Sequence, residues 1–214
     1  MDIDIVPGTG PVVAEPIRDE SDVAALPELT PDRLEAIEEA VRLITAELDP
    51  AVALIGFAGA PWTVATYMIA GHGTPDQAPS RLMLYREPAR LEKLLDILAE
   101  ASARYLIAQI DAGADAVKIF DSWAGVLDRV AFERCSVAPV RKIIETVKRE
   151  RPGTPVIAFP KGAGWQYRDY REKTGADMIA LDWTVPLDVA AQLQVSRRKL
   201  ERHFAASLGM PPAE

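Results

Sequence analysis

Apolar residues along this chain recur in two alternating patterns. From Leu34 to Leu48 they return every three or four residues, which is the spacing of one helix face. A second such stretch begins at Pro88 and ends before Gly113. Short, nearly continuous apolar runs stand between the periodic stretches and are typical of strands buried on both faces. The pattern predicts strands over 52–57, 116–120, 155–159 and 178–181, and helices over 34–48, 88–112, 137–149, 166–174 and 186–194.

Strands that alternate with helices predict a parallel sheet with helices packed outside it. We therefore expect the α/β class, with about four parallel strands and flanking helices. A (β/α)8 TIM barrel needs eight strands, so the pattern alone leaves open whether this is part of a barrel or an open sheet. Residues 1–30 are rich in Pro and Gly and predict an extended, turning segment. Within it, Ile3, Ile5 and Val6 fit the end of a strand.

Composition narrows the classes of function. The 214 residues are 49% apolar, enough for one sizeable buried core, and the formal net charge of -8 argues against broad binding to nucleic acid or an anionic membrane. Apolar runs stay shorter than the roughly 18 residues of a membrane helix, and the acidic start lacks the order of a signal peptide. The single cysteine, Cys135, forms no internal disulfide and fits a reducing compartment. We expect a cytoplasmic protein.

Ligand sites in parallel α/β folds lie at the carboxyl ends of the strands. That rule selects four segments in this chain: 56–63, 120–125, 159–162 and 181–184. Their short polar residues, Asp121, Ser122 and Asp182, either cap the following helices or contact a ligand. Gly56 and Gly59 permit either a tight turn or close approach to a ligand. His72 has no second ligand at metal-binding spacing, so we predict no metal site.

Several motifs resemble uroporphyrinogen decarboxylase. The main one is Gly-Phe-Ala-Gly-Ala-Pro-Trp-Thr at 56–63, which continues through Tyr-Met-Ile-Ala-Gly at 67–71. Phe-Asp-Ser-Trp-Ala-Gly at 120–125, Leu-Asp-Trp-Thr at 181–184 and Val-Pro-Gly-Thr-Gly-Pro at 6–11 support it. The resemblance covers residues 1 to about 194. It implies a TIM barrel that acts as a homodimer and, without metal or organic cofactor, decarboxylates the four acetate side chains of uroporphyrinogen III to give coproporphyrinogen III.

The resemblance also implies roles for individual residues. Tyr67 and Ser122 match the family's active-site tyrosine and serine, and both would donate hydrogen bonds to substrate carboxylates. Phe57 falls on an apolar, pocket-lining position. The family's arginine-bearing segment and central aspartate would precede residue 1, and its late histidine loop would follow the matched region. We therefore expect impaired activity from this chain, with an inactive remnant that still dimerises or binds porphyrins as the alternative.

The last residues depart from this pattern. Val-Ser-Arg-Arg-Lys-Leu-Glu-Arg-His-Phe at 195–204 resembles the second DNA-reading helix of AraC-type regulators, with Ser196 as the cap and Arg197 and Arg198 facing DNA. The competing interpretation is a basic amphipathic helix or a scar of gene fusion, and the acidic net charge favours it. We predict two parts, a decarboxylase-like unit at 1–194 and a helical tail at 195–214. A DNA-associated fusion is the corresponding alternative function.

Overall fold

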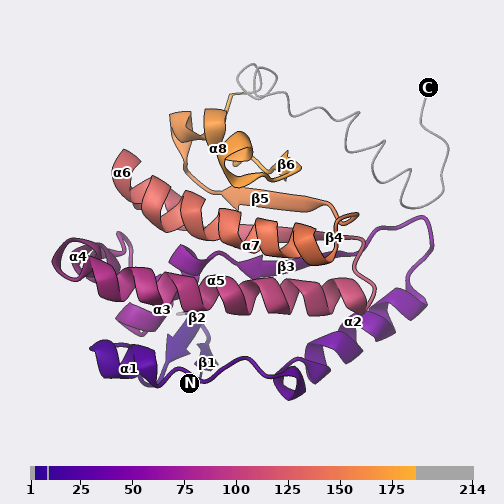
Figure 1. Ribbon diagram of the computed structural model, residues 1–214, viewed down its shortest axis with the longest axis horizontal. Helices are drawn as coiled ribbons and strands as arrows, with labels where there is room; N and C mark the ends of the chain where they lie inside the picture. Colours follow the sequence, from indigo (N-terminus) through magenta and orange to yellow (C-terminus); the bar gives the residue numbers. More distant parts are fainter. Residues whose placement is uncertain (1–2, 9, 187–214) are drawn as a thin grey trace.

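The computed structural model describes residues 3–8 and 10–186, and its centre is a parallel sheet of four strands. The strands stand in the order β3 (Ile55–Gly59), β4 (Ala116–Asp121), β5 (Val156–Pro160) and β6 (Met178–Ile179). Every neighbouring pair is parallel, so each strand is followed by a return through helices, as Figure 1 shows. The predicted α/β class, four parallel strands and flanking helices are confirmed.

Helices fill each connection between strands. Pro occupies the first turn of α3, α4 and α5, where its missing N–H has no partner to lose. One continuous helical stretch joins α6 to α7 through a π-helical turn, η3 (Glu133–Val137). The connecting elements are α3 (Pro61–Ala70), α4 (Ala78–Arg86), α5 (Pro88–Asp111), η2 (Ala124–Val126), α6 (Arg129–Phe132), α7 (Ala138–Glu150), η4 (Gly164–Gln166) and α8 (Tyr167–Thr174).

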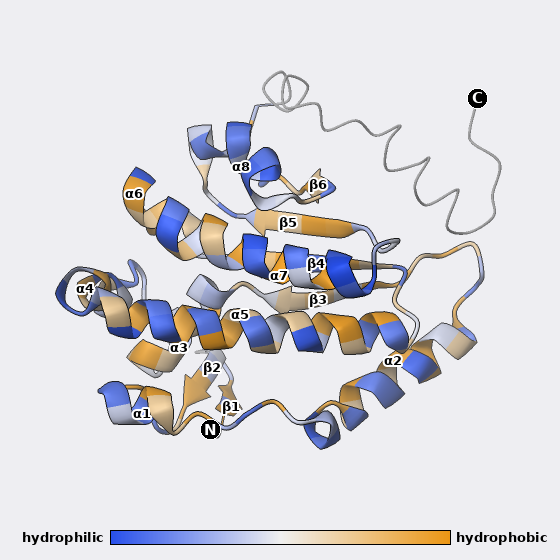
Figure 2. Cartoon of the chain, in the orientation of Figure 1, coloured by the Kyte–Doolittle hydropathy of each residue, from blue (hydrophilic) through white to orange (hydrophobic). Residues whose placement is uncertain are grey.

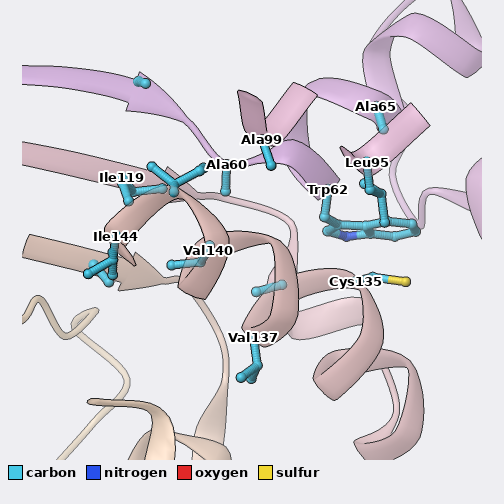
Figure 3. Packing of buried hydrophobic residues seen from close by; sticks show 14 of the residues in the cluster. Ala60, Trp62, Ala65, Leu95, Ala99, Ile119, Cys135, Val137, Val140 and Ile144 are labelled. Atoms are coloured by element: carbon cyan, nitrogen blue, oxygen red, sulfur yellow. The ribbon is translucent and has the colours of Figure 1, made fainter. Parts of the chain in front are cut away.

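The hydrophobic core lies between the sheet and the helices on one of its faces. Figure 1 shows α5 and α7 running side by side in front of the strands, and Figure 2 shows both helices striped with apolar and polar residues. Trp62, Leu95 and Cys135 belong to one buried cluster, to which α3, α5 and η3 contribute (Figure 3). Such packing removes large apolar side chains from water and is the main source of stability.

The opposite face of the sheet carries a different set of side chains. Phe57 is 60% exposed and Ile55 is 42% exposed. Lys118, which is in register with Phe57, is partly buried, and so are Phe120 and Phe159, which are in register with Gly59. Lys118 places its ammonium group 4.4 Å from the ring centre of Phe120 and 4.9 Å from that of Phe159. We call Ile55, Phe57, Lys118, Phe120 and Phe159 the open sheet face. The described strands form an open sheet and do not close into a barrel.

The segment before the sheet is more ordered than the sequence predicted. β1 (Ile3–Val6) and β2 (Gly10–Val13) pair as an antiparallel hairpin, which contains the expected strand. The hairpin is tied to the end of α3, because the Val13 N–H donates to the Gly71 carbonyl at 2.8 Å. The remaining elements are α1 (Glu20–Ala24), which begins with a capping box at Asp19, η1 (Pro31–Arg33) and α2 (Glu35–Glu47).

Several boundaries differ from the predicted ones. The first strand of the sheet begins at Ile55 rather than residue 52, because the Leu54 N–H donates to the Asp115 carboxylate and not to a neighbouring strand. On α2, the predicted inner face is incomplete, since Ile44 is 48% exposed. The helix predicted at 186–194 and the tail at 195–214 lie outside the described residues. No helix in the described part of the chain is both long and apolar enough to span a bilayer.

Candidate active site at the carboxyl edge of the sheet

Four loops meet where the strands of the sheet end, as the sequence predicted for a parallel fold. Backbone hydrogen bonds tie the loops after β3 and β5 to the end of β4, which lies between them: the Ala60 N–H donates to the Phe120 carbonyl at 2.8 Å, and the Lys161 N–H donates to the Asp121 carbonyl at 3.0 Å. These loops therefore stand in a fixed row. We call the row the carboxyl edge, and it comprises residues 59–63, 121–125, 160–162 and 182.

The loops after β4 and β5 touch through two glycines. A Cβ atom on Gly125 would lie 2.8 Å from the carbonyl oxygen of Gly162 and 3.0 Å from its Cα. Gly162 also has a φ of 74°, a left-handed conformation that favours glycine. Because both obstacles are backbone atoms, only glycine at position 125 allows this approach.

Gly56 serves packing of the same kind on β3. A Cβ there would lie 2.8 Å from the Oε1 atom of Gln109 on α5, whose amide side chain pairs with the backbone of Phe57. The glycine therefore lets α5 approach the strand. Gly56 serves this packing and neither of the two predicted roles, a tight turn or a ligand contact.

Asp121, the last residue of β4, is buried and accepts hydrogen bonds from two side chains. Thr63 Oγ1 donates to Oδ1 at 2.7 Å, and Ser136 Oγ donates to Oδ2 at 2.6 Å. Ser136 Oγ also lies 3.1 Å from the hydroxyl of Tyr170. The helix-capping interpretation is thus wrong for Asp121, because its carboxylate bonds to hydroxyl groups on α3 and η3 rather than to backbone N–H groups of the next helix.

Burial raises the pKa of Asp121 to about 6, although the hydrogen bonds from Ser136 and Thr63 act in the opposite direction. The same burial raises the pKa of the Cys135 thiol to about 12 and that of Tyr170 well above its usual range. Desolvation penalises the charged form of each group. Asp121 is therefore the member of this buried cluster that changes charge near neutral pH.

Tyr67 lies beside Trp123, which belongs to the loop that carries Ser122. The ring centres of Tyr67 and Trp123 are 6.4 Å apart, and Ser122 directly precedes Trp123 on the loop after β4. Trp62, which is buried on α3, holds this loop by donating its Nε1 hydrogen to the Trp123 carbonyl at 3.1 Å. Tyr67 and Ser122 are each partly exposed. The structure thus brings these two predicted site residues to one end of the sheet.

Phe57 lies elsewhere. It stands two residues before the end of β3, on the open sheet face, with its ring edge-on to Phe120 at a centroid distance of 5.9 Å. Its exposed ring is available to an apolar ligand on that face. The structure does not place it in the contact between Tyr67 and Trp123.

A second carboxylate is held at the far end of the row. Asp182 accepts hydrogen bonds from the Gly162 N–H at 2.6 Å and the Tyr167 hydroxyl at 2.8 Å, and Thr184 donates to it as well. Partial burial acts to raise the pKa of Asp182, but the hydrogen bonds from Thr184, Gly162 and Tyr167 outweigh it and hold the pKa below its usual range. Asp182 therefore stays charged and braces the loop after β5.

Sequence reasoning missed part of this site. Thr63 lay within a segment that was singled out, but Ser136 and Tyr170 carried no signal, because a single Ser or Tyr on a helix is common. In the described part of the chain, no three His, Cys, Asp or Glu side chains gather as metal ligands, and exposed His72 contacts the Gly73 carbonyl. The absence of a metal and of a cofactor stays a prediction.

Comparison with known proteins gives one consistent result. The family model for uroporphyrinogen decarboxylase matches residues 1–201, which extends past the predicted boundary at residue 194. A uroporphyrinogen decarboxylase of Chelativorans sp. (strain BNC1) is 54% identical over 187 residues, covering 87% of this chain and 54% of that protein. Those of Brucella canis and Brucella abortus are 60% identical over 162 residues, covering 76% of this chain and 48% of theirs. The chain spans about half the length of these curated relatives.

Proposed function

Because this chain belongs to the uroporphyrinogen decarboxylase family, we propose that its carboxyl edge is the part of a porphyrinogen site that contacts substrate carboxylates. The substrate would be uroporphyrinogen III, and the reaction the removal of its four acetate carboxyl groups in porphyrin and haem biosynthesis. The juxtaposition of Tyr67, Trp123 and Ser122 within a matched family sequence supports the proposal.

The chemistry makes specific demands on such a site. Breaking the bond between an acetate methylene and its carboxylate releases CO2 and leaves an electron pair on the methylene carbon. A pyrrole ring protonated on carbon accepts that pair as an exocyclic double bond, protonation of the methylene carbon then yields a methyl group, and loss of the proton added to the ring restores the pyrrole. A site that holds the polyanion and fixes one arm therefore accelerates the reaction by positioning and electrostatics, without metal or organic cofactor.

The chain's own residues suit the positioning role. The hydroxyl groups of Tyr67 and Ser122 each supply a donor for a substrate carboxylate, and a hydrogen bond to a charged group is worth about 1.5–3 kcal/mol. Phe57 supplies an apolar contact for the macrocycle on the open sheet face. That face would be the inward face of the family's barrel, since barrel interiors are lined by alternate residues of each strand. A cytoplasmic homodimer completes the proposal.

The direct test is anaerobic incubation of the purified chain with uroporphyrinogen III, with loss of carboxyl groups followed by chromatography. A full-length relative assayed in parallel verifies the substrate. Binding of uroporphyrin, the oxidised macrocycle with the same carboxylates, is measured separately by quenching of tryptophan fluorescence. Binding without turnover would assign the chain to the non-catalytic alternative while keeping the site.

Matched variants identify the residues responsible. We expect Tyr67→Phe and Ser122→Ala each to weaken uroporphyrin binding about 10- to 100-fold, the loss of one hydrogen bond to a carboxylate. Tyr85→Phe is the control, because Tyr85 is exposed on α4 and donates its hydroxyl hydrogen to Asp128 rather than to any site residue. Equal affinity for all three variants and the unaltered chain would rule out the proposed contacts.

A further inference from the structure

A buried hydrogen-bond network joins the two elements that carry Tyr67 and Ser122, the residues proposed to contact substrate carboxylates. Its centre is Asp121, whose two carboxylate oxygens are each occupied by a side-chain hydroxyl, one from α3 and one from η3. All three residues are buried: Asp121 is 1% exposed, Ser136 is fully buried and Thr63 is 8% exposed. The network therefore acts on the site through the elements that it joins and not by touching a ligand.

One branch leads to Tyr67. Thr63, which donates to Asp121, lies in the first turn of α3, and Tyr67 is four residues further along the same helix. Residues at that spacing lie on the same helix face, one turn apart. The bond between Thr63 and Asp121 therefore fixes the rotation of α3 that sets where the Tyr67 hydroxyl lies.

The other branch leads to Ser122. This residue follows Asp121 directly in the chain, and its other neighbour, Trp123, donates its backbone N–H to Thr63 Oγ1 at 3.3 Å. Thr63 thus donates to one flank of Ser122 and accepts from the other. The Thr63 hydroxyl that anchors α3 therefore holds the side chain of the residue before Ser122 and the backbone of the residue after it.

The π-helical turn supplies the third support. An extra residue in a helix rotates the side chains around it, and such turns are frequent at functional sites. In this chain the turn places Ser136 against Asp121 and within reach of Tyr170 on α8. The carboxylate is thereby held by hydroxyl groups from two elements, α3 and η3, and Tyr170 on α8 supports it through Ser136.

We propose that Asp121 is a positioning residue, which sets the relative placement of Tyr67 and Ser122 and thereby the affinity of this site for a polycarboxylate macrocycle. This inference rests on the proposed function for its ligand. Its structural part, the coupling of Asp121 to the loop at Ser122 and Trp123, stands on the geometry alone.

Protonation gives the network a second arrangement. When charged, Asp121 only accepts hydrogen bonds; when neutral, one oxygen becomes a donor and must reverse its bond to Thr63 or Ser136. The other titratable groups that face it, Cys135 from η3 and Tyr170 from α8, have pKa values raised by burial and stay neutral. Because burial raises the pKa of Asp121 to about 6, this change falls close to neutral pH.

The experiment measures uroporphyrin binding by tryptophan quenching between about pH 5 and pH 8. The variants are Asp121→Asn, which keeps the shape and removes the charge, and the pair Thr63→Val and Thr63→Ser, which removes or keeps the hydroxyl. We expect the Asn and Val variants to bind about tenfold more weakly and the Ser variant to recover most of the affinity. The affinity of the unaltered chain should show an inflection near pH 6 that is absent from Asp121→Asn, because an amide does not titrate in this range. Titration of the ligand affects both chains equally and therefore cannot cause the difference.

A measurement without ligand separates the two hypotheses. The amide resonances of Ser122 and Trp123 are followed by NMR over the same pH range in the unaltered chain and in Asp121→Asn. A shift centred near pH 6 that disappears in the variant supports the coupling even if no macrocycle binds, in which case only the proposed function fails. Resonances that do not respond to pH, or unchanged affinity in both Asp121→Asn and Thr63→Val while Tyr67→Phe weakens binding, would overturn the positioning role.

Discussion

The buried carboxyl group of Asp121 makes the stability of this chain depend on pH in an unusual direction. Its pKa is about 6 in the folded chain and close to 3.8 when solvated. The folded state therefore binds the proton more tightly than the unfolded state does. This contribution to stability is fully present below about pH 4 and is lost as the pH rises through about 6.

The size of the effect follows from the two pKa values. At about 1.4 kcal/mol for each pKa unit, the rise from 3.8 to about 6 corresponds to about 3 kcal/mol. Asp121→Asn removes this dependence and keeps an acceptor for Thr63. We therefore expect the free energy of unfolding of Asp121→Asn, minus that of the unaltered chain, to increase by about 2–3 kcal/mol between about pH 4 and pH 7.

Urea unfolding at a series of pH values measures this difference, provided that the slope against urea stays the same in both chains. Asp182→Asn is the matched control. Because hydrogen bonds hold the pKa of Asp182 below its usual range, its contribution is fully present above about pH 4 and is lost only at lower pH, so its difference curve should stay nearly flat between about pH 4 and pH 7. A difference curve for Asp121→Asn that is as flat as that of Asp182→Asn over this range would refute the reasoning.

Three further predictions concern other parts of the fold. Gly125→Ala should lower the free energy of unfolding, measured in urea, by about 1–3 kcal/mol, because its Cβ would meet the Gly162 backbone. The control is Gly153→Ala, which has open space around its Cβ and should change the free energy of unfolding by no more than about 0.5 kcal/mol. Equal losses in the two variants would contradict the close approach. Cys135, buried and with a raised pKa, should react far more slowly with a thiol reagent in buffer than in urea, and equal rates would show that it is accessible. Phe57, which is 60% exposed, offers an apolar surface on the open sheet face, so Phe57→Asp should reduce both the binding of a hydrophobic dye and any self-association measured by sedimentation. Unchanged values would mean that this face is covered.

The sequence predicted the fold class because its signals are local. Pro88 at the start of α5 and the apolar run at 116–120 each specify an element without reference to the rest of the chain. The rule for parallel sheets then placed Ser122 and Asp182 at one edge of the sheet, where the structure has them. The roles of Tyr67 and Ser122 came from the resemblance and stay predictions.

Other features depended on contacts between distant residues. The interpretation of Asp121 as a cap failed because a short polar residue after a strand looks the same whether it bonds to the next helix or to hydroxyl groups 58 residues away at Thr63 and 15 residues away at Ser136. The shortened start of β3 had a similar origin, since the side chain of Asp115 takes the Leu54 N–H.

Periodicity and composition by themselves therefore determined the four strands of the sheet, the helices α2, α5, α7 and α8, that the sheet is parallel, and which loops share its carboxyl edge; they did not predict α1, α3, α4, α6 or the pairing of β1 with β2. Only the tertiary structure decided which polar groups are buried together, that Gly125 and Gly162 touch, and that a π-helical turn directs Ser136 toward Asp121. The physical reason is that secondary structure follows from the spacing of apolar residues along one segment. Burial and the partners of a hydrogen bond depend on which segments cover one another in space.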